Sequence, residues 1–190
     1  MITLKFKTPD AWAKGIVAAM DVFLPDHAAA EKKASSMAMT MVSHYPDKHE
    51  LVNAMIDLAV EELSHFRSVV RLMHERGLTL QADEKDPYVN ALRRHCRQGS
   101  EFYLMDRLLV AAIVEARGAE RFGMLAAALP DGDLKPFYDA ITRSEIGHER
   151  LFLQFAEKYF EQSQVRLRLD ELLETEAAIV RELPIRLALH

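Results

Sequence analysis

The chain has 190 residues, of which 49% are hydrophobic and 28% are charged, with only 7 glycines and 7 prolines. This length fits one globular domain with a substantial core, and the composition excludes collagen-like, low-complexity and many-turned all-β chains. The single cysteine, Cys96, excludes an internal disulfide framework and any metal site built from several cysteines of one chain.

A formal net charge of −5 provides no overall attraction to nucleic acid, so an RNA partner would need a local basic patch. No apolar run reaches the length that spans a membrane, and the first residues lack the order of basic, apolar and small residues of a signal peptide. We expect a soluble, cytoplasmic protein without a membrane partner.

Apolar residues recur at helical intervals along most of the chain, and no segment alternates as a β-strand does. Thr8 is expected to cap the first helix, a break is expected at residues 23–25, and Asp26 is expected to cap the second helix. Asp47 with Glu50 has the spacing of a capping box. Further boundaries are expected at Gly77, Asp86-Pro87, Ser100 and Pro130.

These signals predict an all-α fold in a single domain over residues 1–190. Four main helices are expected over about 26–43, 47–76, 100–129 and 135–160, and extra helices over about 9–20, 86–98 and 164–183.

Two of the expected main helices carry a Glu-x-x-His motif. The first is Glu62-Leu63-Ser64-His65 and the second is Glu145-Ile146-Gly147-His148. Residues three apart share one face of a helix, so the carboxylate and the imidazole of each motif can reach one metal ion. A single such motif is more often two surface residues than a site.

The helix before each motif carries one more glutamate. Glu31 lies 31 residues ahead of Glu62, and Glu115 lies 30 residues ahead of Glu145. The midpoint of each pair falls in an expected turn, and residues equidistant from the turn of an antiparallel hairpin lie level with each other. Because the flanking residues are apolar, these carboxylates would need a cation or a proton.

Together the two hairpins offer four carboxylates and two neutral imidazoles, whose charge balances two divalent ions. Oxygen and imidazole ligands suit iron or manganese. The same arrangement characterises the ferritin-like di-iron and di-manganese proteins, so the predicted class is a ferritin-like four-helix bundle with additional short helices.

The chain also resembles one family within this superfamily, the bacterial tRNA hydroxylases that act on methylthio-isopentenyladenosine. The similar stretches are DHAAAEKKA at 26–34, EELSHF at 61–66 and DRLLVAAIVEAR at 106–117, followed by Glu120-Arg121-Phe122. The resemblance covers most of residues 10–160.

The resemblance implies a di-iron monooxygenase that uses O2 to hydroxylate the isopentenyl side chain of an adenosine beside the tRNA anticodon. Glu62 and Glu145 would bridge the two irons, Glu31 and Glu115 would be terminal ligands, and His65 and His148 would each bind one iron. Electrons would come from an external reductase or ferredoxin, since the chain shows no flavin, haem or iron–sulfur motif. The oligomeric state stays open between monomer and dimer.

Other residues carry weaker predictions. Glu61 could contact a ligand imidazole or be solvated, and Arg117 with Glu120 could form a buried or an exposed pair near Glu115. Gly118, Gly123 and Gly147 lie inside expected helices, which indicates close packing or crowding at the metal. The candidate tRNA contacts are the basic residues Lys32, Lys33, Arg93, Arg94 and Arg97. The alternative for the arginines is an ordinary polar helix face paired with nearby acids.

Three other functions fit a di-metal bundle. Bacterioferritin-like iron storage would require a hollow shell of many subunits. A manganese catalase or rubrerythrin-like peroxidase would differ in its metal content, and the single cysteine excludes a rubredoxin part. A protein-interaction role with a vestigial site would survive complete loss of metal.

Overall fold

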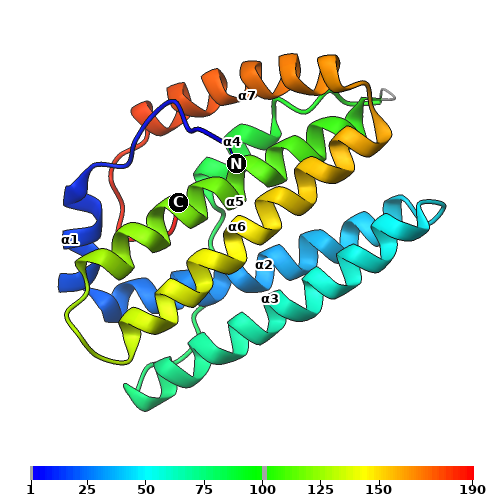
Figure 1. Cartoon of the computed structure of the whole chain (residues 1–190). Coiled ribbons are helices and arrows are strands. Elements are labelled where there is room, and N and C mark those ends of the chain that lie inside the picture. The colour runs from blue at the N-terminus through cyan, green and yellow to red at the C-terminus, as the bar shows by residue number, and fades with distance from the viewer. Residues whose placement is uncertain (1, 100–101) are drawn as a thin grey trace. The chain divides into compact units, whose positions relative to one another are not determined.

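The computed structural model describes residues 2–99 and 102–190, and within these ranges the regular structure consists of seven helices and no β-strand (Figure 1). The predicted all-α class is therefore confirmed. The helices are α1 (Asp10–Ala18), α2 (Met20–His44), α3 (His49–Glu75), α4 (Pro87–Arg93), α5 (Tyr103–Ala128), α6 (Leu134–Tyr159) and α7 (Gln162–Glu182). Within the described ranges, none of these helices is both long and apolar enough to cross a membrane.

Two compact units make up the chain. The α2–α3 unit comprises Ala18–Glu84 and Leu187–Leu189, and the α5–α6 unit comprises Met1–Val17, Lys85–Arg186 and His190. Each unit is built around one antiparallel helix hairpin (Figure 1).

In the α2–α3 unit, apolar side chains of both helices form the core, and Phe23, Leu24 and Met55 have no exposed surface. The expected break at residues 23–25 is wrong, because α2 begins at Met20 and continues through Pro25. A proline inside a helix costs about 3 kcal/mol. Complete burial of Phe23 and Leu24 contributes about 1.5–3 kcal/mol each and offsets that cost.

Hydrogen bonds at the helix ends separate correct from incorrect boundary predictions. Gly77 has φ +72°, and the Leu78 N–H donates to the Met73 carbonyl at 2.9 Å, as in the predicted glycine cap of α3. The Asp86 carboxylate accepts the Val89 N–H at 2.9 Å and caps α4 as predicted. Ser100 lies outside the described residues.

Three predicted caps are wrong, because their side chains make other contacts. Asp47 pairs with Lys48 at 3.2 Å, and α3 begins after Lys48 without a side-chain cap. Asp26 accepts the Leu189 N–H at 2.7 Å. The Thr8 hydroxyl donates to Glu120 at 2.7 Å, and α1 begins at Asp10.

In the α5–α6 unit, α5 is the central helix and is packed against α6, α7 and α4. The ribbon of α7 runs along α5 (Figure 1). Because α5 has neighbours on several sides, it is buried from Leu104 to Ala126 on more than one face. A polar side chain on α5 therefore needs a partner on a neighbouring element.

Candidate metal centre

The α2–α3 hairpin gathers three of the predicted ligands. Glu31 on α2 and Glu62 and His65 on α3 offer ligand atoms that all lie within 4.8 Å of one another. His65 Nδ1 lies 3.7 Å from Glu31 Oε2 and 3.5 Å from Glu62 Oε2. Glu31 and Glu62 are only 3% and 1% exposed. The equal distance of Glu31 and Glu62 from the turn thus places them level in the hairpin.

Burial disfavours the charged forms of the residues in this group, and contacts within the group compensate for it. Burial disfavours the charge on Glu31, but hydrogen bonds with His27 and His65 outweigh it and hold the pKa of the carboxyl below its usual range. Burial lowers the pKa of His65, yet Glu31 and Glu62 raise it to about 10. In the absence of a metal, His65 is therefore protonated at neutral pH, and its positive charge partly neutralises Glu31 and Glu62.

His27 is a residue of this group that the sequence analysis missed. Its side chain is fully buried, and its Nε2 lies 2.6 Å from Glu31 Oε1. The spacing of four residues between His27 and Glu31 on one helix is the signal that could have identified it. His27 fixes one oxygen of Glu31 and leaves the other directed towards His65.

The α5–α6 hairpin gathers the other three predicted ligands in the same way. Ligand atoms of Glu115, Glu145 and His148 lie within 4.8 Å of one another, and His148 Nδ1 is 3.9 Å from Glu115 Oε2. Glu115, Glu145 and His148 are 5%, 5% and 4% exposed. In both hairpins the Nδ1 atom of the histidine faces the carboxylates, so the two motifs have the same arrangement.

The Nε2 atoms of the two histidines face different groups. Glu61 Oε1 lies 3.9 Å from His65 Nε2, whereas the Ser144 hydroxyl lies 3.5 Å from His148 Nε2. Both residues precede their histidine by four positions. A group at this nitrogen orients a metal-binding imidazole and tunes its basicity. The contact predicted for Glu61 is thus long, and the two halves differ in charge at this point.

Gly118 on α5 faces the carboxylate of Glu145 on α6. A Cβ atom at Gly118 would lie 3.3 Å from Glu145 Oε2, which is closer than an ordinary van der Waals contact. The glycine therefore leaves space for this carboxylate, as expected from its position inside a helix. A Cβ atom at Gly123 would make only an ordinary contact with Thr142 at 3.5 Å, and one at Gly147 would meet nothing within 4 Å among the described residues beyond its own stretch of helix, so crowding is wrong for Gly147.

Arg117 and Glu120 form the buried version of the predicted pair. Arg117 is 0% exposed and contacts Glu120, while its Nη2 lies 2.7 Å from Oε1 of Glu176 on α7. Glu176 is also 0% exposed and accepts the Tyr88 hydroxyl at 3.0 Å. Sequence reasoning missed Glu176, since nothing local links two residues 59 positions apart.

The basic residues proposed for tRNA are arranged differently from the prediction. The helix expected over 86–98 ends at Arg93, so Arg97 does not share a helical face with Arg93. Arg97 instead binds Asp106 through its backbone N–H and its guanidinium, at 2.6–2.9 Å. Lys32 pairs with Asp83 at 2.8 Å, and Lys33 donates to the Glu84 carbonyl at 2.6 Å. Arg93 and Arg94 are exposed.

The donor set of each hairpin fits a divalent metal ion. Two carboxylates and one imidazole nitrogen are the ligands that iron and manganese accept. Two ligand atoms that each lie about 2.0–2.2 Å from one ion are separated by about 3–4.4 Å. The separations of 3.5, 3.7 and 3.9 Å between the imidazole nitrogens and the carboxylate oxygens fall in this range.

An all-helical chain with a carboxylate–histidine set on each of two hairpins belongs to the ferritin-like class. The family model described as tRNA-(MS[2]IO[6]A)-hydroxylase (MiaE) matches residues 1–190, and the chain belongs to this family. The predicted resemblance is therefore confirmed.

Two curated relatives are tRNA 2-(methylsulfanyl)-N(6)-isopentenyladenosine(37) hydroxylases. That of Pseudomonas putida is 37% identical over 158 residues, which cover 83% of this chain and 77% of the relative. That of Salmonella typhimurium is 34% identical over 134 residues, which cover 70% of this chain and 49% of the relative.

A solved structure described as protein 43 with aldehyde deformylating oxygenase activity from Synechococcus is also similar. It matches with a TM-score of 0.94 and 30% identity over 100% of this chain and 96% of that chain. This agreement over the whole chain confirms the predicted ferritin-like fold.

Proposed function

We propose that this chain hydroxylates the isopentenyl side chain of a modified adenosine beside the tRNA anticodon, using O2, a two-iron centre and an external electron donor. The observation that carries the proposal is the family match over residues 1–190 in a chain that has all six predicted ligands. Both curated relatives carry the name of this hydroxylase.

Six residues would hold the two irons in this proposal. By the family resemblance, Glu62 and Glu145 would be shared by the two irons, Glu31 and Glu115 would be terminal ligands, and His65 and His148 would each bind one iron. The four carboxylates balance the charge of two ferrous ions, which supports two ions over one. When bound, two ferrous ions supply two electrons to O2, the oxidised C–H bond supplies the other two, and a reductase or ferredoxin restores the ferrous state.

The protein's own contribution is to fix and shield these ligands. His27 holds one oxygen of Glu31 at 2.6 Å, which restricts the carboxylate to one orientation. The low exposure of Glu31, Glu62, Glu115 and Glu145 keeps water from competing for their oxygens and strengthens their attraction to cations. Glu61 and Ser144 face the outer nitrogens of the two histidines.

Mass spectrometry of tRNA nucleosides tests the activity. In a bacterial strain that makes methylthio-isopentenyladenosine but lacks a hydroxylase, expression of this chain should produce the hydroxylated nucleoside. The Glu145→Ala variant should produce none and should retain no iron after purification. Glu157→Ala is the matched control, since Glu157 is an exposed residue of the same helix. Iron-loaded protein with a reductase system and no hydroxylated nucleoside would contradict the proposal.

A second candidate function is oxidative deformylation of an aldehyde. The observation that favours it is the similarity over the whole chain to the Synechococcus protein with aldehyde deformylating oxygenase activity. Release of formate from an aldehyde by the iron-loaded protein, with no change in tRNA nucleosides, would support this function and contradict tRNA hydroxylation.

A further inference from the structure

The α5–α6 unit contains a pocket that the proposed hydroxylation does not use. Its volume is about 190 Å³, and all its lining residues belong to this one unit. The lining comes from the N-terminal segment with α1, the start of α4, α5, the end of α7 and the residues that follow α7. Such a pocket is smaller than the usual range of about 300–1,000 Å³ for small-molecule sites, so it accommodates one small ligand unit.

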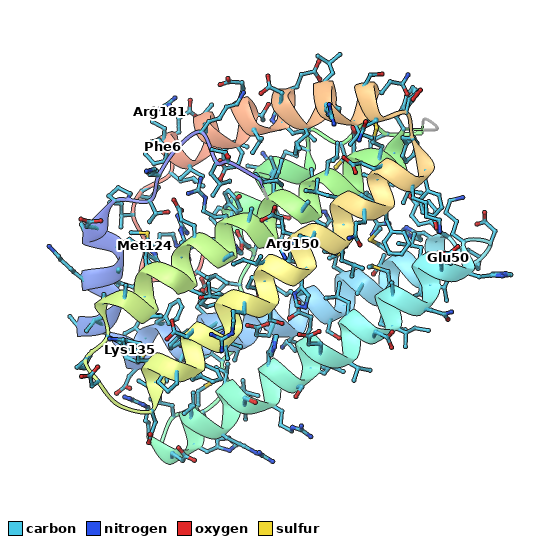
Figure 2. All side chains as sticks on the ribbon, viewed as in Figure 1. Phe6, Glu50, Met124, Lys135, Arg150 and Arg181 are labelled. Atoms are coloured by element: carbon cyan, nitrogen blue, oxygen red, sulfur yellow. The ribbon has the colours of Figure 1, made fainter. Side chains whose placement is uncertain are left out.

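The wall of this pocket combines three arginines with aromatic and aliphatic residues. Arg121, Arg181 and Arg186 contribute to it, and its lining among the described residues includes no aspartate or glutamate. The Arg181 guanidinium lies 5.5 Å from the Phe6 ring, and Figure 2 shows these two labelled side chains next to each other. The Arg121 guanidinium lies 5.4 Å from the Trp12 ring. Guanidinium groups beside aromatic rings favour a ligand that carries both an anion and a flat ring.

Arg121 is half-buried, whereas Arg181 is exposed. Burial and the neighbouring charge of Arg117 lower its pKa to about 10, so it stays protonated at neutral pH in surroundings that disfavour its charge. Arg117 is compensated by Glu176 and Glu120. Glu120 and Glu176 also attract the charge of Arg121 and raise its pKa, and its Nε donates to the Thr8 hydroxyl at 3.3 Å. Because these groups offset the burial only in part, a phosphate beside Arg121 would still be attracted.

His190 adds a hydrogen-bonding group to the same pocket. Its Nδ1 lies 3.0 Å from Asp86 Oδ2, and its ring stacks on Tyr88 at 5.0 Å. The side chain is only 7% exposed, and Nε2 has no hydrogen-bond partner among the described residues. Because Asp86 accepts the proton on Nδ1, Nε2 can accept a hydrogen bond from a ligand N–H or O–H. A ribose hydroxyl or the exocyclic amine of a base supplies such a donor.

We propose that this pocket binds one nucleoside monophosphate unit of the tRNA, at a nucleotide other than the one that is hydroxylated. Arginines take the phosphate, the half-buried Phe6 ring contacts the flat base, and His190 accepts a hydrogen bond from the sugar or base. Arg181 is exposed, so the rest of a strand can continue into solvent from this rim. The choice of tRNA as the source rests on the proposed function.

Trp12 provides the test, because it is the single tryptophan of the chain and lines the pocket. The iron-loaded protein is titrated with AMP, adenosine and inorganic phosphate while tryptophan fluorescence is measured. AMP should give a saturable change in fluorescence, and adenosine and phosphate should each bind with at least tenfold lower affinity. Arg181→Ala combined with Arg186→Ala should lower the affinity for AMP at least tenfold. In the unmodified chain, tRNA should displace AMP. His190→Ala should weaken AMP but leave phosphate binding unchanged.

Arg166→Ala is the matched control, since Arg166 is an exposed arginine of α7 outside the pocket, and it should bind AMP as the unmodified chain does. No saturable change with AMP, or unchanged AMP affinity in the double arginine variant, would overturn the site. AMP binding that tRNA cannot displace would overturn the tRNA assignment. These measurements do not depend on hydroxylation, and the nucleoside analysis does not depend on AMP, so the two proposals fail separately.

Discussion

At the scale of single residues, Gly118 lies against a proposed iron ligand, Glu145, on the facing helix. A Cβ atom there would lie 3.3 Å from Glu145 Oε2 and would move that carboxylate by a few tenths of an ångström. We expect Gly118→Ala to lower iron affinity by about 10–100-fold, the range seen when groups behind metal ligands are changed. Iron content after dialysis against a weak chelator measures this effect.

Gly147 is the control for this substitution, because a Cβ atom built there meets nothing within 4 Å among the described residues beyond its own stretch of helix. Gly147→Ala should keep its iron and gain up to about 1 kcal/mol of stability from better helix propensity. Full iron content and unchanged activity in Gly118→Ala would show that Glu145 does not need its observed position.

The buried carboxylate of Asp106 should make the stability of the chain depend on pH. Its side chain has no exposed surface and binds Arg97 at 2.6 Å and Arg168 at 3.1 Å. Burial raises its pKa, but the two arginines outweigh burial and hold the pKa below the usual 3.8. The unfolded chain therefore binds a proton before the folded chain does. The stabilisation is complete above about pH 4 and is lost as the pH falls through the folded pKa.

Urea unfolding from pH 7 to pH 3 measures this contribution. Asp106→Asn should lower the free energy of unfolding by about 1–2 kcal/mol at pH 7, since Arg97 is partly solvated. The difference from the unmodified chain should shrink below pH 4. Asp170→Asn, at an exposed partner of Lys5, should change stability by less than about 0.5 kcal/mol. A difference that stays constant down to pH 3 would contradict the ion pair.

At the scale of helices, a fully buried ion pair between Arg117 and Glu176 joins α5 to α7. Arg117 and Glu176 are both 0% exposed, and two guanidinium nitrogens lie 2.7 and 2.9 Å from Glu176 Oε1. Glu176→Ala would leave the Arg117 charge buried with less compensation. We expect a loss of about 3 kcal/mol in the free energy of unfolding, measured by denaturant titration. Glu174 lies on the same helix as Glu176 and makes an exposed contact with Lys5. Glu174→Ala should therefore cost less than about 1 kcal/mol.

The helices show which parts of the molecule local sequence signals can predict. Level placement of Glu31 with Glu62 follows from equal spacing about a turn, so the sequence alone brought the predicted residues of each half together, although it missed His27. The continuation of α2 through Pro25 did not follow, because tertiary burial of Phe23 and Leu24 outweighs a local helix-breaking signal. Pairs between distant segments, such as Arg117 with Glu176, carry no local signal at all.

Because α4 ends at Arg93 and Arg97 is paired with Asp106, two of the three arginines proposed for tRNA remain as candidate phosphate contacts here. Arg93 and Arg94 are exposed, whereas Arg97 is bound to Asp106. Changing Arg93 and Arg94 to Ala should weaken tRNA binding about equally for all tRNA sequences. It should also reduce the slope of log K against log salt by about 2, one unit for each lost phosphate contact. Iron content should not change, and an unchanged slope would place the RNA surface elsewhere.

At the scale of the whole molecule, the proposed ligands are divided equally between the two compact units. The α2–α3 unit carries Glu31, Glu62 and His65, and the α5–α6 unit carries Glu115, Glu145 and His148. Without a cation, two buried carboxylates within each group repel each other. An ion that binds only the folded chain stabilises it by about 2.7 kcal/mol when its free concentration is 100 times Kd.

Removal of iron should therefore lower the melting temperature. For a chain of this size, 1 kcal/mol corresponds to about 2–4 °C, so we expect a decrease of about 5–10 °C at neutral pH. Differential scanning calorimetry of the iron-loaded and chelator-treated protein measures it. Glu145→Ala should melt at the same temperature with and without chelator, because its iron is already lost. Equal melting temperatures for the unmodified protein with and without iron would contradict a buried metal centre.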